Sequence, residues 1–175
     1  MTSGQGISVH ASAVLVGDRA VLIRGPSGSG KSRLAFDLIV AGRSGQLPPV
    51  ILVGDDRVYL EARQTGLFVR PVRELAGLIE IRGLGIRRCA FAPEAMVGLV
   101  VDLGADDAER LPAPESRSTA VSGVELPRLP VNAGFAPLSM VVAILTTTDG
   151  TPLPQPSDDC PKGIGNHISP TIATE

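Results

Sequence analysis

Gly25-Pro26-Ser27-Gly28-Ser29-Gly30-Lys31-Ser32 is the stretch that decides how this chain folds. It satisfies the full pattern GxxxxGK[ST], in which glycines let the backbone curl so that successive N–H groups face phosphate oxygens. In such a loop, Lys31 reaches the β and γ phosphates and Ser32 ligates Mg²⁺. The alternative reading, an ordinary Gly/Ser turn, is disfavoured because the whole pattern is matched. The sequence therefore predicts a site for a nucleoside triphosphate and Mg²⁺.

The residues on both sides of this loop supply the context that the motif requires. Apolar runs at Val14 to Val16 and Ala20 to Arg24, separated by Gly17-Asp18, predict a β-hairpin that leads into the loop. From Lys31 to Ala41 the apolar residues recur at helical spacing, and Gly42 supplies a stop. The loop thus lies between a strand and a helix, whose positive dipole end favours phosphate.

The rest of the chain predicts an α/β domain with a central sheet and the active site at its strand ends. Further strands are predicted at Val50 to Val53, Arg57 to Ala62, Gly66 to Arg70 and Leu99 to Leu103. Less regular segments are a short helical or turn segment at Val72 to Leu78, a tight loop at Glu80 to Ile86, a polar stretch at Ala105 to Glu125 and an apolar run at Ser139 to Thr147.

Length and composition restrict the class of protein. With 175 residues, 43% of them hydrophobic, the chain is long enough for one domain with a core. A net charge of -2 gives no electrostatic footprint for nucleic acid or an anionic membrane. Cys89 and Cys160 form no disulfide framework or zinc motif, and the N-terminus lacks the pattern of a signal peptide. We therefore expect a cytoplasmic protein.

Two segments near the C-terminus need separate expectations. The stretch from Leu129 to Thr148 carries no charge, but prolines and polar residues interrupt it, which favours a buried segment over a membrane span. Residues 149–175 contain too few apolar side chains to offset the entropy of ordering, so they predict a mobile tail. The folded domain is expected to span residues 1–148.

Acidic residues end two of the apolar strands. Asp55-Asp56 follows Val50 to Val53, and Asp102 follows Leu99 to Val101, so either strand could deliver a carboxylate to the metal. Adjacent carboxylates repel each other unless a cation lies nearby, which favours the Asp55-Asp56 pair and leaves Asp102 open. His10 could orient or share a proton with one of these acids, although a lone histidine is more often structural.

Read together and in this order, four features make the chain similar to the catalytic domain of the bacterial HPr kinase/phosphorylase family. They are His10, the phosphate loop, Asp55-Asp56 and Glu80-Ile81-Arg82-Gly83-Leu84-Gly85-Ile86. The resemblance runs from about Ser8 to about Val142 and is that of a short form without the N-terminal domain of longer members. It implies a P-loop kinase domain of the HPr kinase/phosphoenolpyruvate carboxykinase-like type, with a central mixed sheet and flanking helices.

The resemblance also implies an activity. Members of the family use ATP and Mg²⁺ to phosphorylate a serine of the phosphocarrier protein HPr, and as phosphorylases they use inorganic phosphate to remove it, yielding pyrophosphate. Pyrophosphate is therefore a second candidate donor. The implied role is regulation of the phosphotransferase system and of carbon metabolism, and the implied assembly is a hexamer.

Residue roles follow from matching the family's motifs to this sequence. The Asp55-Asp56 pair would hold the proton acceptor, with Asp56 favoured, and Ser32 and Glu80 would ligate Mg²⁺. Arg110, within Glu109-Arg110-Leu111 where the family has Asp-Arg-Leu, would stabilise charge on the transferring phosphoryl group. The residues implied to be catalytic are His10, Lys31, Asp55, Asp56 and Arg110. Those implied to hold the nucleotide are Gly25, Pro26, Ser27, Gly28, Ser29, Gly30, Lys31, Ser32, Arg82 and Gly83.

This chain departs from the family's pattern at two places. The later Pro-Val-x-x-Gly-Arg-Asn box, associated with dephosphorylation, reads Pro130-Val131-Asn132-Ala133-Gly134-Phe135-Ala136 here, without its Arg and Asn. The histidine motif reads Val-His-Ala rather than His-Gly. The kinase reaction is thus the stronger expectation, and the phosphorylase reaction stays open.

Two other classes of function remain compatible with the loop. A kinase of a small molecule or nucleotide would have the same phosphate loop, but no Arg-rich lid is recognisable in the sequence. A regulatory module that binds ATP without transferring phosphate is the other, and the intact carboxylates argue against it. No NKxD motif for guanine is present, which disfavours a GTPase.

Overall fold

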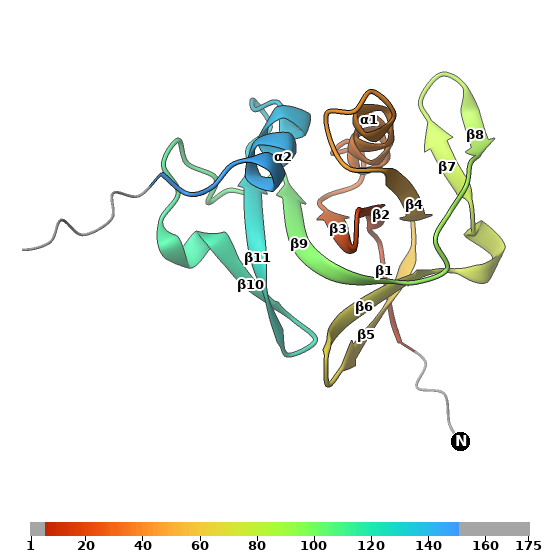
Figure 1. The fold of residues 1–175 in the computed structure, drawn as a ribbon, viewed down its shortest axis with the longest axis horizontal. Coiled ribbons are helices and arrows are strands. Elements are labelled where there is room, and N and C mark those ends of the chain that lie inside the picture. Colours follow the sequence, from red (N-terminus) through yellow and green to blue (C-terminus); the bar gives the residue numbers. More distant parts are fainter. Residues whose placement is uncertain (1–5, 151–175) are drawn as a thin grey trace, which may run out of the picture.

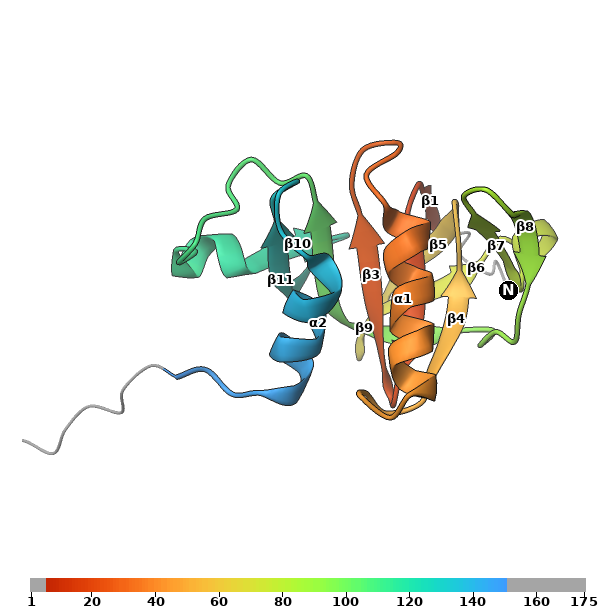
Figure 2. The same ribbon diagram turned by 90° about the horizontal axis from the view of Figure 1, so that it is seen from above.

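A curved sheet with two helices on one side makes up the described part of the chain, residues 6–150 of the computed structural model (Figures 1 and 2). The α-helices are α1 (Lys31–Arg43) and α2 (Pro137–Thr146), and the short 3-10 helices are η1 (Arg73–Leu75) and η2 (Pro114–Arg117). The strands are β1 (Ile7–Val9), β2 (Ser12–Val16), β3 (Arg19–Arg24), β4 (Val50–Gly54), β5 (Val58–Arg63), β6 (Gly66–Pro71), β7 (Leu78–Ile81), β8 (Gly85–Arg88), β9 (Ala95–Leu103), β10 (Ser118–Val121) and β11 (Val124–Val131).

The main sheet is mixed and brings several strand ends to one edge. Its order is β1-β5-β6-β9-β3-β2-β4, with β11 also pairing with β9 and with β10. Strands β3, β9 and β11 are parallel neighbours, and β4 runs in the same direction because β2 is antiparallel to both β3 and β4. The segments that follow β3, β4 and β9 therefore start at the same edge, and the phosphate loop is one of them (Figure 2). The predicted α/β domain with a central mixed sheet is confirmed.

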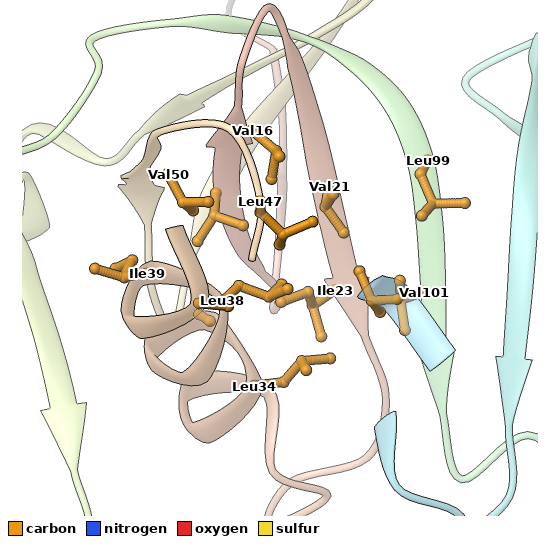
Figure 3. Close-up of a cluster of buried hydrophobic side chains, with 14 of the residues drawn as sticks. Val16, Val21, Ile23, Leu34, Leu38, Ile39, Leu47, Val50, Leu99 and Val101 are labelled. Atoms are coloured by element: carbon orange, nitrogen blue, oxygen red, sulfur yellow. The ribbon is translucent and has the colours of Figure 1, made fainter. Parts of the chain in front are cut away.

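Strict alternation along β3 explains why the sheet has a core on each face. Val21 and Ile23 point to the helical face, where they pack with Leu34 and Leu38 of α1 (Figure 3). Ala20 and Leu22 point to the other face and join a second cluster made largely by the strands. Both helices cover the first face, since Val141 of α2 belongs to the same cluster as the α1 residues.

The predicted hairpin and helix around the loop are confirmed, with one change at the helix end. The helix continues past Gly42 to Arg43, and the N–H of Ser44 donates to the carbonyl of Val40 at 2.9 Å. Close packing, rather than termination of the helix, explains why glycine occupies position 42. A Cβ there would lie 2.8 Å from the backbone nitrogen of Val50, so glycine lets α1 pack closely on β4.

Other boundaries differ from the sequence-based expectation. The strand predicted at Leu99 to Leu103 begins at Ala95, and the loop predicted at Glu80 to Ile86 is the hairpin of β7 and β8. Gly83 in its turn and Gly85 at the start of β8 have positive φ, and these glycines interrupt the alternation that would have indicated strands. The polar stretch at Ala105 to Glu125 contains η2 and β10.

The expectation of a buried segment at Leu129 to Thr148 is wrong for most of its length. It comprises the end of β11 and the helix α2, in which Val141 is the buried residue. Ile144 and Leu145 are 42% and 39% exposed. Within residues 6–150, no helix has both the length and the apolar character that a membrane crossing requires. The tail predicted over residues 149–175 lies, from residue 151 onward, outside the described residues.

Candidate active site

The phosphate loop joins β3 to α1 in a conformation that depends on glycine. Gly25, Gly28 and Gly30 have φ of 148°, 77° and 97°, which L side chains rarely adopt. A Cβ on Gly25 would lie 2.7 Å from the carbonyl oxygen of Leu103, whereas one on Gly28 or Gly30 would meet no atom within 4 Å. The loop is therefore packed against the end of β9 on one side and open on the other.

Lys31 and Ser29 direct polar groups into this loop. The Lys31 side chain is 6% exposed, and its Nζ donates to the carbonyls of Gly25 and Pro26, both at 2.9 Å. The Oγ of Ser29 is buried and has no hydrogen-bond partner among the described residues. A buried hydroxyl without a partner is costly, and a phosphate oxygen would satisfy it. The loop thus fits a polyphosphate.

Asp55, at the carboxyl end of β4, is the centre of the site. It is 3% exposed, and its carboxylate accepts three hydrogen bonds. Oδ1 accepts from the hydroxyls of Ser12 at 2.6 Å and Ser32 at 2.9 Å, and Oδ2 accepts from the backbone N–H of Glu80 at 3.1 Å. Four segments far apart in the sequence meet at this one side chain, which is held immobile beside the helix start.

Asp56 differs from Asp55 in everything but residue type. Its side chain is 69% exposed, and Oδ1 lies 3.3 Å from Nε2 of His10, which is 47% exposed. Its backbone has φ of 63°, the left-handed region that few residues other than glycine, asparagine and aspartate adopt. The strained turn directs the two carboxylates to different surroundings, so Asp56 keeps oxygens free for an incoming group.

Three of the remaining predicted residues lie on the β7–β8 hairpin. Glu80 reaches the site through its backbone N–H, and its side chain is exposed. Arg82 and Gly83 lie on the exposed turn of the hairpin, and neither has an ion pair or side-chain hydrogen bond among the described residues. The structure therefore brings Glu80 next to Asp55, whereas within residues 6–150 no hydrogen bond or ion pair joins Arg82 or Gly83 to the phosphate loop.

Arg110 lies in the segment between β9 and η2. It is exposed and lines a shallow groove with Leu129, Phe135 and Met140, beside the first turn of α2. Among residues 6–150, no hydrogen bond or ion pair joins it to the phosphate loop. The segment starts close by, since a Cβ on Gly104 would lie 3.6 Å from Cδ of Pro26. The segment thus begins near the loop, and Arg110 lies further along it at the groove.

Asp102 was the second candidate for the metal-binding acid, but in the structure it forms ion pairs with two arginines. Arg24 donates to its two oxygens at 2.7 and 2.8 Å, and Nε of Arg128 donates to Oδ2 at 2.6 Å. Arg128 in turn holds Asp107. Burial would raise the pKa of Asp102, but the hydrogen bonds from Arg24 and Arg128 outweigh it, so the pKa is lowered. The network ties β3, β9 and β11 together, with Arg24 directly preceding the phosphate loop.

We expect Asp102→Asn to lower the free energy of unfolding by about 1–3 kcal/mol at neutral pH, because two guanidinium groups lose their shared partner. A lowered pKa means that this stabilisation is present above the ordinary carboxyl pKa of 3.8 and is lost as the pH falls through the folded-state value. Urea denaturation at neutral and acid pH measures this: the difference between wild type and variant should shrink in acid. An equal difference at both pH values would contradict it.

The donor set at the loop suits Mg²⁺. Ser32 and Asp55 offer oxygen ligands, and Mg²⁺ is usually held by one or two protein groups together with water and substrate phosphates. Within residues 6–150 there is no cluster of three or more His, Cys, Asp or Glu side chains that would form an all-protein cage. Ser32, Asp55 and Glu80 would hold the ion only together with a bound phosphate.

Sequence reasoning missed Ser12. It is fully buried, although it stands in an otherwise apolar strand, and its hydroxyl contacts Asp55. The available signal was that Ser12 is the single polar residue of Ser12–Val16. His10 and Ser12 each contact one member of the Asp55-Asp56 pair.

Comparisons with known proteins agree with this geometry. The family model described as the HPr serine kinase C-terminal domain matches residues 3–147. A protein named HPr kinase/phosphorylase from Mycoplasma mycoides subsp. mycoides SC is 32% identical over 147 residues, covering 75% of this chain and 44% of the relative. Another of the same name, from Geobacillus thermodenitrificans, is 36% identical over 141 residues, covering 73% of this chain and 43% of the relative.

A solved structure has the same fold. It is described as the Hpr(Ser) kinase/phosphatase from Coxiella burnetii, and it matches with a TM-score of 0.62 at 23% sequence identity, covering 78% of this chain and 86% of that one. The chain spans less than half the length of the two curated relatives compared with it.

Proposed function

Because the chain belongs to the family of the HPr serine kinase C-terminal domain, we propose that it transfers the γ-phosphoryl group of ATP to a serine of an HPr-like phosphocarrier protein. The observation that supports this most strongly is the contact of Asp55 with Ser32 at 2.9 Å. It joins the acid of one strand to the hydroxyl that follows the phosphate loop, and this pairing is what a Mg²⁺-nucleotide site needs.

The residues of the candidate site have distinct roles in this proposal. The loop amides and Lys31 bind and orient the β and γ phosphates, and Ser32 and Asp55 provide oxygens beside them. Ser32 and Asp55 would hold Mg²⁺ beside the phosphates, and the ion would supply positive charge that offsets theirs. Asp55 already accepts three hydrogen bonds, so the more exposed Asp56 takes the proton from the attacking serine hydroxyl. His10 orients Asp56 for that transfer.

A role for Arg110 in the proposal depends on movement of the segment that carries it. It lies on the segment that begins beside the phosphate loop, but within the described residues its side chain makes no hydrogen bond or ion pair with the site. For Arg110 to stabilise charge on the phosphoryl group, the segment would have to close on the bound substrates. The same holds for Arg82 on the hairpin turn.

The reverse reaction, in which inorganic phosphate removes the phosphoryl group from the carrier, belongs to the same proposal as a second direction. The loop Asn132 to Ala136 follows β11, and the N–H groups of Gly104 and Ala105 donate to the carbonyl of Val131. This places the altered box beside the segment that contacts the phosphate loop. The box is associated with dephosphorylation in the family and lacks its Arg and Asn here, so we expect the kinase direction to dominate.

An acceptor comparison tests the proposal against its two competitors. The protein is incubated with Mg²⁺, γ-labelled ATP and either an HPr-like carrier, the carrier with its acceptor serine changed to alanine, or a panel of small hydroxyl compounds. Label on the intact carrier alone supports the proposal. Label on a small acceptor would indicate a small-molecule kinase, and nucleotide binding without any labelled acceptor would indicate a regulatory module.

A further inference from the structure

We propose that Ser12 is a positioning residue that sets the affinity of the site for Mg²⁺ by holding the carboxylate of Asp55. The inference rests on the proposed Mg²⁺-nucleotide site and adds a residue to it. Its basis is the hydrogen bond from Ser12 Oγ to Asp55 Oδ1 at 2.6 Å, in the range of a strong bond between a hydroxyl and an ionised carboxylate.

The local structure makes this contact a specific one. Ser12 is 0% exposed and begins β2, whose pairing with β4 shifts register between Ala13 and Val14. Ala13 is opposite Gly54, so the irregularity brings Ser12 next to the residue that follows β4, namely Asp55. A buried hydroxyl on an apolar strand is costly unless it is paired, and Asp55 is its partner.

The hydroxyls of Ser12 and Ser32, which both donate to Oδ1 of Asp55, have different roles. Ser32 is placed to give an oxygen to Mg²⁺, so its orientation must serve both the ion and Asp55. Ser12 lies on β2, outside the phosphate loop, and its hydroxyl donates to Asp55. It therefore keeps the carboxylate in the same orientation whether or not the ion is bound, which lowers the ordering cost of binding.

A merely structural serine would affect folding stability without affecting the metal. The two roles separate in a titration of Mg²⁺ at a fixed concentration of a fluorescent ADP analogue, followed by fluorescence of the bound nucleotide. We expect Ser12→Ala to raise the Mg²⁺ concentration at half-saturation about 10-fold, the lower end for loss of a group that orients a metal ligand. Nucleotide affinity measured in EDTA should be unchanged.

Two comparisons complete the test. Ser116→Ala removes a hydroxyl that donates to Ala113 on the exposed 3-10 helix η2, and it should leave the Mg²⁺ titration unchanged. In an Asp55→Asn background, Ser12→Ala should shift the midpoint no further, since Ser12 acts through Asp55.

The outcomes separate the inference from the function that it deepens. If the wild type shows no Mg²⁺-dependent nucleotide binding, the proposed function is overturned, and the inference falls with it. If the wild type binds and Ser12→Ala has the same midpoint, only the inference is overturned.

Should Ser12→Ala fail to fold, Ser12→Cys keeps a weaker donor of similar size. A midpoint raised by cysteine then supports the inference, and a wild-type midpoint overturns it.

Discussion

Phosphoryl transfer is expected to fall by on the order of 10³-fold or more when Lys31 is replaced by alanine, because the phosphates lose the ammonium group that neutralises charge in the transition state. The side chain is almost fully buried and directed into the loop, where its Nζ donates to the carbonyls of Gly25 and Pro26. Steady-state transfer of label from ATP to the carrier measures the loss.

The same substitution also removes two hydrogen bonds within the loop, so loss of activity must be separated from loss of structure. Thermal unfolding of Lys31→Ala in the absence of nucleotide checks that the domain is intact. Arg33→Ala is the matched control, since Arg33 lies on the same helix with its side chain 88% exposed and only a 3.8 Å contact to Asp37. An intact Lys31→Ala protein with normal transfer would contradict the role of the loop.

The second large effect is expected from Asp56→Asn, which should lower kcat by roughly 10²- to 10⁴-fold while leaving nucleotide affinity largely unchanged. Asparagine has the same shape as aspartate but does not accept the serine proton. It also tolerates the left-handed backbone at this position, where φ is 63°, so the turn is retained. Single-turnover transfer together with equilibrium nucleotide binding separates the two quantities.

Asp55→Asn gives the contrast that assigns roles within the acidic pair. Asp55 is held by two hydroxyls and one backbone N–H, so its loss should act on the Mg²⁺ dependence and on folding stability as well as on kcat. Asp18→Asn, at a turn residue that is 92% exposed, is the neutral control. A normal kcat for Asp56→Asn, with a loss confined to Asp55→Asn, would transfer the proton-acceptor role to Asp55.

Local pattern predicted the elements that build the centre of the site. The glycine pattern of Gly25 to Ser32, the hairpin before it and the helix after it depend on short-range rules of turn and helix formation, and all three are confirmed. The strand before Asp55 was equally clear, because a short apolar run bounded by turn residues is typical of a strand, although Ile51 is 38% exposed.

Features that the sequence pattern did not determine depend on tertiary contacts. Asp102 and Asp55 both end apolar strands, and only the structure shows that Asp102 is taken by Arg24 and Arg128 while Asp55 contacts Ser32. The buried position of Ser12 depends on a register shift between β2 and β4, which no local rule specifies. The exposed apolar side of α2 has the same composition as a buried segment, so composition alone could not separate the two.

Residues assigned through family resemblance alone remain predictions. Glu80 lies beside Asp55 through its backbone, whereas Arg82, Gly83 and Arg110 are on exposed segments around the site. Their proposed roles would require these segments to approach the bound substrates, and local sequence pattern does not report such an approach.

The most direct test of the account is the mass spectrum of a purified HPr-like carrier after incubation with this protein, ATP and Mg²⁺. The account predicts that the carrier gains one phosphoryl group on a serine with the wild-type protein and remains unmodified with Lys31→Ala and Asp56→Asn. A carrier that stays unmodified with folded, nucleotide-binding wild-type protein, or that is modified equally by all three proteins, would contradict it.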